Sequence, residues 1–170
     1  MYQTKTKKLC LAGLFAAIIF VTTAYFFHIP IGTNGGYLHF GDAFVYLAGS
    51  ILPAPYAMAA SAIGAGLSDA LSPGGIIWLP ATVIIKSLVA LCFTYQSKTI
   101  LCKRNYFALG GACIITLVGY YFAGVLITGN VMAGLAEIPG SLLQSAGSAL
   151  VYFLTGYVLD RVNIKSKAAI

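Results

Sequence analysis

Charged residues are nearly absent from two long stretches of this chain. Residues 9–97 and 105–159 together contain only four charged side chains: Asp42, Asp69, Lys86 and Glu137. Over the whole sequence 8% of residues are charged and 59% are hydrophobic, whereas soluble domains carry about 25% charged residues. A core of this size could not hide so much apolar surface from water, so the composition predicts an integral membrane protein.

Turns and short polar segments divide the apolar sequence into six hydrophobic segments. We expect each to be a helix, with approximate bounds 9–27, 41–52, 56–71, 76–95, 106–128 and 141–159. A helix over 41–52 would rise only about 18 Å against a hydrocarbon core of about 30 Å, so five spans are an alternative to six. The predicted fold is an all-α integral membrane protein, a six-transmembrane-helix bundle that forms a single membrane domain over residues 1–170. Residues 28–40, which are rich in glycine, and residues 129–140 are predicted loops.

The basic residues predict the orientation of this bundle. Six spans place nine of the ten basic residues on one side: Lys5, Lys7, Lys8, Lys98, Lys103, Arg104, Arg161, Lys165 and Lys167. The positive-inside rule makes that side cytoplasmic, so both termini are predicted to be inside. The other side receives Asp42, Asp69, Glu137 and both histidines.

Motifs for nucleotide- or metal-dependent chemistry are missing from the sequence. There is no GxxxxGK[ST] phosphate-binding loop, no HExxH and no GxSxG. The four cysteines form no CxxC pair, and the basic residues show no stripe with interleaved aromatics that would suggest nucleic acid. We therefore expect no enzymatic activity, no cofactor and no metal site. Energy for active transport would have to come from another chain.

Lys86 is the charge that most needs an explanation. It lies about ten residues into the predicted helix 76–95, and hence about 15 Å deep. A lysine near the bilayer centre costs about 2.5–3.5 kcal/mol on insertion scales, so it should face the bundle interior and have a partner. It either binds an oxygen or anionic group of a ligand or pairs permanently with Asp69 or another interior group. The two roles are compatible.

Other polar and aromatic residues gather in the predicted outer half. His39 and Asp42 could share one helical face, or Asp42 could be a helix N-cap; a metal site that adds His28 is a less favoured alternative. Aromatic walls with a few placed polar groups are typical of ligand pockets, although Trp78 and Tyr46 could also be interfacial aromatics. The predicted substrate-binding residues are Asn34, His39, Asp42, Tyr46, Asp69, Trp78, Lys86, Tyr120, Glu137 and Gln144.

The first helix carries a pattern of small residues. In LAGLFAA, Ala12 and Ala16 lie four residues apart, with Gly13 and Ala17 beside them. Small residues at this spacing let another helix approach closely in lipid. The pattern predicts either packing within the bundle or a docking face for a partner protein in the membrane.

The chain resembles the substrate-binding S component of energy-coupling factor (ECF) vitamin transporters, and is most similar to the riboflavin-transporter-like branch. The resemblance covers nearly the whole chain and is carried by LAGLFAA, HFGDAFVYLAGSILPAPYAMAASAIGAGLSDAL, IIWLPATVIIKSLVAL and EIPGSLLQSAGSALVYFLTGYVLDR. It implies a high-affinity binding subunit in the plasma membrane of a prokaryote. The implied partners are a T component and two ATPase subunits, which would use the ATP.

The resemblance also implies how this subunit would work. Ala12 and Ala16 would dock on the T component, and the S component would topple in the membrane to release its ligand inward. A hydroxymethylpyrimidine-like or pyridoxine-like compound is the leading substrate, with riboflavin and queuine or queuosine as alternatives. A membrane enzyme with an outer-face polar site and a self-sufficient small-solute transporter are the competing functions.

Overall fold

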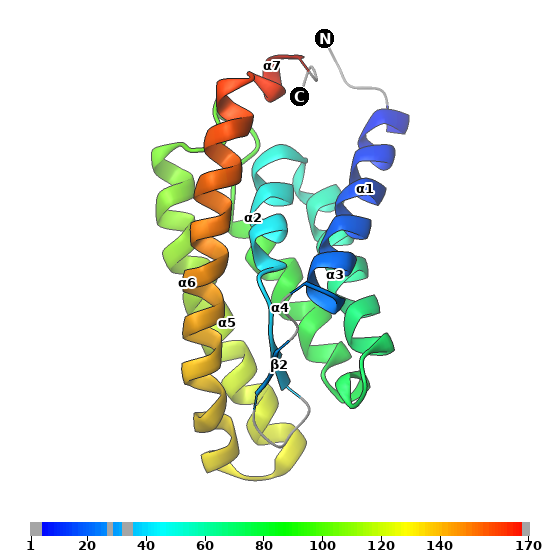
Figure 1. The fold of residues 1–170 in the computed structure, drawn as a ribbon, viewed down its shortest axis with the longest axis vertical. Coiled ribbons are helices and arrows are strands. Elements are labelled where there is room, and N and C mark those ends of the chain that lie inside the picture. The colour runs from blue at the N-terminus through cyan, green and yellow to red at the C-terminus, as the bar shows by residue number, and fades with distance from the viewer. Residues whose placement is uncertain (1–4, 27–28, 32–35, 168–170) are drawn as a thin grey trace.

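The structure is a computed structural model that describes residues 5–26, 29–31 and 36–167. A bundle of helices makes up most of it, with a short 3-10 helix, η1 (Gly75–Ile77), between the third and fourth (Figure 1). The helices are α1 (Lys5–Ala24), α2 (Asp42–Ile51), α3 (Ala54–Leu71), α4 (Leu79–Cys92), α5 (Lys103–Thr128), α6 (Val131–Arg161) and α7 (Ile164–Lys167). Among the described residues α1, α5 and α6 are each long and apolar enough to cross a membrane, and α2 and α4 are shorter apolar helices. A helical membrane bundle is thus confirmed, whereas the number of spans and their orientation stay predictions.

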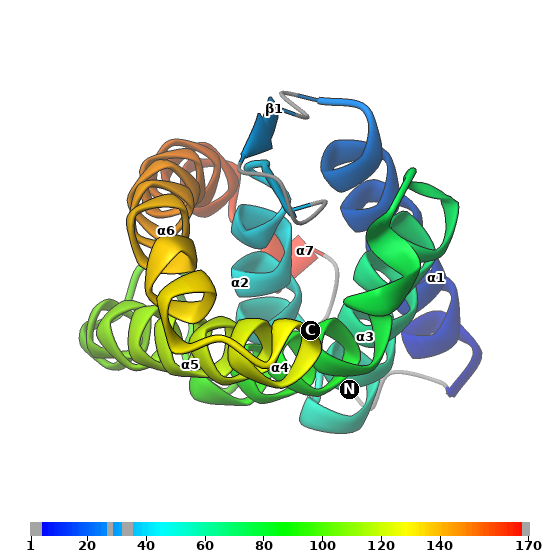
Figure 2. The same cartoon turned by 90° about the horizontal axis from the view of Figure 1, so that it is seen from below.

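The short helix α2 occupies the centre of the bundle. It packs against α1, α3, α4 and α6, and the view along the bundle shows it surrounded by the longer helices (Figure 2). Every residue of α2 except Phe44 is buried. A helix that is hydrophobic on all sides needs burial on all sides, so α2 is a core element.

A small hairpin replaces part of the predicted glycine-rich loop. Strands β1 (Ile29–Ile31) and β2 (Gly36–Leu38) pair antiparallel, with Ile29 opposite Leu38. The hairpin lies on the side of the bundle between α6 and α1, and β2 contacts α6 (Figure 2). The chain is therefore not purely helical, because two short apolar stretches here flank a run of glycine-rich turn residues rather than following a helical period.

The sixth helix begins about ten residues earlier than the sequence predicts. Residues 131–140 were expected to belong to a loop, yet α6 runs without a break through Pro139. The Asn130 side chain caps the new start by accepting a hydrogen bond from the Met132 amide at 2.9 Å. Gly134 lets this part of α6 lie close to α5, since a Cβ there would come within 2.7 Å of the Tyr121 carbonyl oxygen. Close packing of α6 on α5 compensates for the loss of the backbone hydrogen bond that Pro139, which has no amide hydrogen, cannot make.

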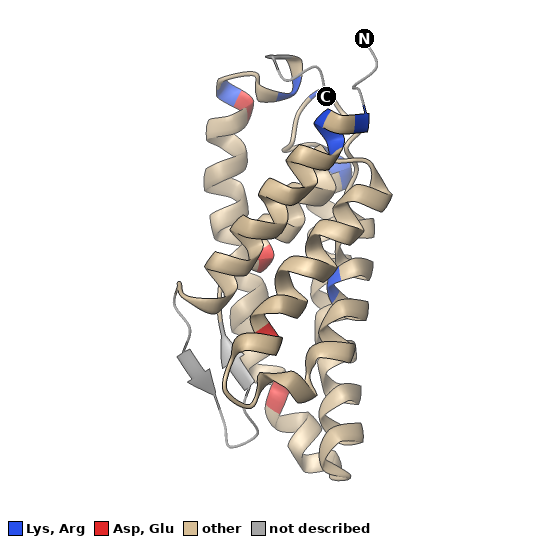
Figure 3. Ribbon diagram, turned by 90° about the vertical axis from the view of Figure 1, so that its right-hand side faces the viewer, with Lys and Arg blue, Asp and Glu red and all other residues tan. Residues whose placement is uncertain are grey.

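Lysines and arginines gather at one end of the bundle, which we call the basic end (Figure 3). α1 begins there, α6 ends there, and the α4–α5 connection lies there (Figure 1). That connection is held by partly buried polar contacts. The Asp160 carboxylate accepts hydrogen bonds from the amides of Ile100 and Leu101 at 2.7 and 2.9 Å. Lys165 donates to the carbonyls of Tyr95 and Ser97.

Candidate functional site

A buried ion pair in the middle of the bundle is the centre of the candidate site. The Lys86 Nζ lies 2.7 Å from Asp42 Oδ1 and 2.8 Å from Oδ2. Gln144 donates a hydrogen bond from Nε2 to Asp42 Oδ2 at 2.9 Å. These three side chains come from α4, α2 and α6 and are at most 6% exposed. We call them the Asp42 triad.

The position of Asp42 in α2 explains how a carboxylate can occupy this interior. Asp42 is the first residue of the helix, where the backbone amides and the helix dipole favour negative charge. It does not cap the helix, because the N-cap residue is Gly41 and no side chain caps it. His39 precedes the helix, so the predicted shared helical face is wrong. His39 is buried, and its Nδ1 accepts a hydrogen bond from the Gly41 amide at 3.1 Å.

An aromatic wall adjoins the ion pair on the side of α4 and α5. The Lys86 Nζ lies 5.1 Å from the centroid of the Tyr120 ring, a cation–π distance. The Tyr120 hydroxyl hydrogen-bonds Thr82 Oγ1 at 3.2 Å, and its ring centroid lies 6.2 Å from that of Trp78. Trp78, Thr82 and Lys86 are spaced by four residues and so follow one face of α4. Thr82 was not among the predicted residues, although this spacing from Lys86 could have revealed it.

Asp69 joins the site through the turn that links α3 to α4. Gly74 at φ 75° reverses the chain, and a Cβ at Gly75 would come within 2.6 Å of the Asp69 carbonyl oxygen, so only glycine fits this approach. Asp69 is 4% exposed and interacts electrostatically with Tyr120. The sequence left open whether Lys86 pairs with Asp69 or with another interior group, and the residue that pairs with it is Asp42.

Tyr46 faces a different part of the core. It lies one turn after Asp42 on α2, and its ring stacks on Phe93 at 5.0 Å and meets Tyr152 edge-on at 5.9 Å. The Tyr152 hydroxyl in turn bonds Ser50 Oγ at 2.9 Å. Tyr46 is therefore part of an aromatic cluster between the Asp42 triad and the basic end, away from Trp78.

Two further predicted binding residues are not brought to the triad by any contact described. Asn34 lies outside the described residues. Glu137 is half-buried on α6, and its Cγ would lie 3.4 Å from a Cβ placed at Gly124 on α5. His28, the third residue of the less favoured metal site, also lies outside the described residues, and no group of three or more His, Cys, Asp or Glu that could hold a metal occurs among the residues described.

The small residues of α1 divide between two faces. Ala12 is buried in the core and Ala16 is partly buried. A Cβ at Gly64 on α3 would come within 2.6 Å of the Ala16 carbonyl oxygen, so this face of α1 packs closely on α3. Gly13 and Ala17 are exposed, and no atom lies within 4 Å of a Cβ placed at Gly13. Docking by Ala12 and Ala16 stays a prediction, but the exposed small face belongs to their neighbours.

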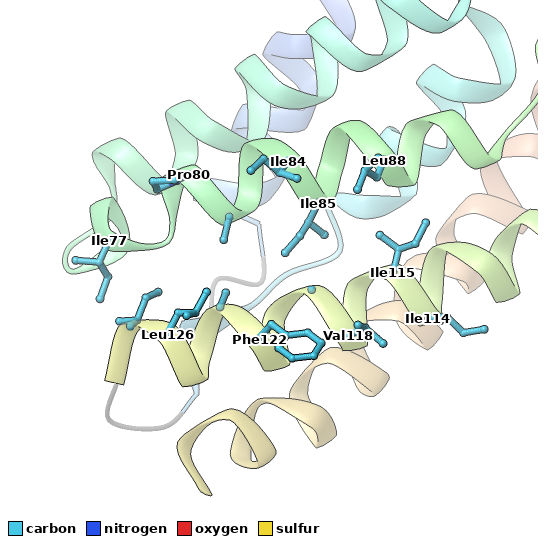
Figure 4. A pocket seen from close by; sticks show the side chains of 14 residues that line it. Ile77, Pro80, Ile84, Ile85, Leu88, Ile114, Ile115, Val118, Phe122 and Leu126 are labelled. Atoms are coloured by element: carbon cyan, nitrogen blue, oxygen red, sulfur yellow. The ribbon is translucent and has the colours of Figure 1, made fainter. Parts of the chain in front are cut away.

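A groove of about 670 Å³ lies between α4 and α5 on the outside of the bundle (Figure 4). Its walls are apolar and include Ile77, Ile84, Leu88, Val118, Phe122 and Leu126. Two residues that line the groove, Ile85 on α4 and Gly119 on α5, precede Lys86 and Tyr120 in the sequence. None of the polar residues of the site lines the groove. The groove can accommodate apolar hydrocarbon groups, and it is separate from the Asp42 triad.

The helical membrane architecture and the buried polar site agree with the result of comparison with known families. A sequence profile described as ECF-type riboflavin transporter, S component, matches residues 3–161. The chain belongs to this family. No curated protein matched the chain. The sequence prediction of an ECF S component in the riboflavin-transporter-like branch is thereby confirmed.

Membership in this family establishes the general role of the chain. As an S component it is a membrane protein of the plasma membrane and the substrate-binding subunit of an ECF transporter. It works with T and ATPase components on a small-molecule substrate, and the family is one of transporters, not of enzymes.

Proposed function

We propose that this S component binds a small planar heterocyclic nutrient, and that the Asp42 triad, Thr82, Trp78 and Tyr120 contact it. The leading substrates are hydroxymethylpyrimidine-like and pyridoxine-like compounds. Riboflavin, which the family name specifies, and queuine or queuosine are the alternatives. Such ligands combine a flat ring with hydrogen-bonding edges, which matches aromatic walls beside a carboxylate, an ammonium and an amide.

The buried ion pair carries this proposal. A charged pair removed from water loses more solvation free energy than it regains unless further hydrogen bonds complete it, so such pairs are poor devices for stability. Ionisable groups at membrane depth usually mark substrate or ion pathways. Here the pair is completed by Gln144 from a third helix and lies against Tyr120. Three helices thus converge on one charged point in the interior of the bundle.

The transport step follows from the family. The ATPase subunits supply the energy, and we propose that the S component topples against the T component to deliver its ligand to the cytoplasm of a prokaryotic cell. The six-span bundle with both termini inside would place the triad on the outer side of the basic end.

The test begins with the protein purified gently from its membrane. Native mass spectrometry, followed by release and identification of the bound molecule, should find one heterocyclic nutrient per chain. An empty protein whose melting temperature is unchanged by a panel of vitamins and nucleobases would contradict the proposal.

A variant then links the ligand to the site. Lys86→Met removes the ammonium and should weaken binding of the identified ligand at least tenfold. Ser87→Ala is the matched control, because Ser87 is the next residue of α4 and its hydroxyl bonds the Val83 carbonyl of its own helix. Unchanged ligand affinity in a folded Lys86→Met protein would show that Lys86 does not belong to the binding site.

A further inference from the structure

We infer that Gln144 Oε1 is the atom of the Asp42 triad that recognises the ligand, and that the ligand meets it with an N–H or O–H donor on the edge of its ring. This inference rests on the proposed function and specifies the hydrogen-bonding class of its substrate. Asp42 and Lys86 are then positioning residues, which act on the ligand through the orientation of the Gln144 amide.

The Asp42 carboxylate determines which end of the Gln144 amide faces it. The Lys86 ammonium lies 2.7 Å from Asp42 Oδ1 and 2.8 Å from Oδ2, so this side chain is a carboxylate in an ion pair. A carboxylate only accepts hydrogen bonds, whereas a side-chain amide has one end that donates and one that accepts. Gln144 therefore has to turn its NH2 group toward Asp42, and Nε2 donates to Oδ2 at 2.9 Å. The carbonyl oxygen, Oε1, is the end of the amide that remains for another partner.

This oxygen is the unused hydrogen-bonding atom of the triad. Asp42 and Lys86 are 1% and 0% exposed, whereas Gln144 is 6% exposed. Gln144 Oε1 accepts no hydrogen bond from the residues that the structure describes, yet it is not a fully buried atom. An acceptor in the interior is costly to leave without a donor. A ligand that donates to Oε1 would complete the triad without breaking any contact in it.

Direct recognition by the Lys86 ammonium would break contacts that it already makes. An ammonium has three N–H donors. Both oxygens of Asp42 lie within 2.8 Å of Nζ, and the Tyr120 ring centroid lies 5.1 Å away. The ion pair thus holds the Gln144 amide in one orientation, and loss of Lys86 weakens binding because it releases the Asp42 carboxylate.

The same geometry predicts that one substitution reverses the amide. In Asp42→Asn the side-chain oxygen should stay at the position of Oδ1, because Lys86 lies against it and only donates. The NH2 group of the new side chain then takes the position of Oδ2, opposite Gln144. Since that group donates, Gln144 must accept with Oε1 and turn Nε2 toward the ligand. The variant would no longer present an acceptor to the ligand.

Three pairs of probes isolate the donor on the ring. The parents are hydroxymethyl-aminopyrimidine, pyridoxine and riboflavin. In the analogues a methoxy group replaces the ring amino group or the ring hydroxyl, and a methyl group replaces the ring N–H of riboflavin. Trp78 is the single tryptophan of the chain and belongs to the site, so its fluorescence reports binding. For the parent that binds the wild-type protein most tightly, we expect its analogue to bind at least tenfold more weakly.

Variants on α6 and α2 locate the source of this preference. In Gln144→Met the preference should fall below threefold, because methionine offers no comparable acceptor. Leu143→Met is the matched control and should retain the preference, since Leu143 is the neighbouring residue and is 59% exposed. In Asp42→Asn the preference should fall below threefold or reverse. A tenfold preference that persists in a folded Gln144→Met or Asp42→Asn protein would overturn the inference.

The wild-type protein also tests the inference without any variant. An analogue that binds as tightly as its parent, or more tightly, would overturn it and would leave the proposed function in place, because the parent still binds. If none of the parents binds, the copurified molecule decides. A heterocycle with an N–H or O–H donor on its ring would support the inference, and one without such a donor would overturn it. If no heterocycle copurifies and none binds, the proposed function itself fails.

Discussion

Two groups of buried polar residues in this chain have different roles. The Asp42 triad joins three helices around an ion pair and lies next to Tyr120. A second group lies toward the basic end, where Asn105 donates to Ser50 Oγ and to the Ile100 carbonyl and accepts from the Thr94 amide. The members of the second group hydrogen-bond to one another and to the backbone of the turns around them, so we interpret this group as structural.

Removing one member of the ion pair should destabilise the protein more than removing both charges. Lys86→Met leaves the Asp42 carboxylate buried without its counter-ion, which costs about 3–5 kcal/mol. The double variant Asp42→Asn with Lys86→Met keeps the shape but buries no charge, so it should recover most of that loss. Thermal unfolding of the ligand-free proteins in detergent measures both. A double variant less stable than Lys86→Met would show that the pair is not coupled in this way.

The structural group should respond differently. Asn105→Ala leaves the buried Thr94 amide without its acceptor and should lower the free energy of unfolding by about 1–3 kcal/mol. Ligand affinity, measured by tryptophan fluorescence on the folded fraction, should change less than twofold. Thr99→Ala, at an exposed position of the same connection, is the control. A tenfold loss of affinity in Asn105→Ala would mean that this group belongs to the binding site.

At the scale of elements, α1 presents small residues on two faces with different consequences. The face that contains Ala12 and Ala16 packs on α3, and the face that contains Gly13 and Ala17 is exposed. Close approach of α1 and α3 depends on Gly64. The exposed face is free for an interaction with another helix in lipid, the environment in which small residues favour close packing.

The inner face can be tested at Gly64. A Cβ there would lie 2.6 Å from the Ala16 carbonyl oxygen and 2.8 Å from Ile19 Cβ, so Gly64→Ala forces the helices apart. We expect a loss of about 1–3 kcal/mol in the free energy of unfolding. Gly13→Ala is the matched control, since its Cβ would meet nothing within 4 Å and alanine is the better helix former. Equal stability of both variants would contradict this packing.

The outer face can be tested by association with the partner subunits. We expect the double variant Gly13→Leu with Ala17→Leu to reduce copurification of the T component at least fivefold while ligand affinity stays unchanged. Ala12→Leu should instead lower stability, because Ala12 is 9% exposed and part of the core. The opposite result would be a stable Ala12→Leu protein that no longer copurifies with the T component, together with a double variant that still does. It would show that the T component docks on the face of Ala12 and Ala16, as the sequence predicted.

At the scale of the whole molecule, charge is segregated along the bundle. The basic end carries most lysines and arginines, and the acidic residues other than Asp160 lie away from it (Figure 3). The turn between α3 and η1, with Pro73 exposed, lies at the opposite end (Figure 1). These two ends should lie on opposite sides of the membrane.

Labelling of intact cells tests this orientation. In a protein whose four cysteines are replaced by alanine, Pro73→Cys should react with a membrane-impermeant maleimide from outside. Lys98→Cys, which is exposed in the α4–α5 connection, should react only after the membrane is opened. The reverse pattern would invert the topology, and labelling of both from outside would contradict the predicted spans.

The class of the protein could be predicted from the sequence alone. The scarcity of charge predicts a membrane protein without reference to any contact, because each span must be apolar along its own length. The family pattern over residues 3–161 identifies an S component. The depth of Lys86 follows from its position within one helix, so the need for an interior partner could also be predicted.

The surroundings of Lys86 became known only from the packing of the helices. Asp42 is 44 residues away in the chain, and Gln144 is 102 residues from Asp42. Local periodicity fixes which face of a helix a residue occupies, but it does not say which helices pack together. The same limit explains α6, in which Asn130 and close packing on α5 extend a helix that the sequence around Pro139 argues against. Contacts between segments far apart in the chain, rather than the conformational propensity of either segment, determine the partners of Lys86 and the start of α6.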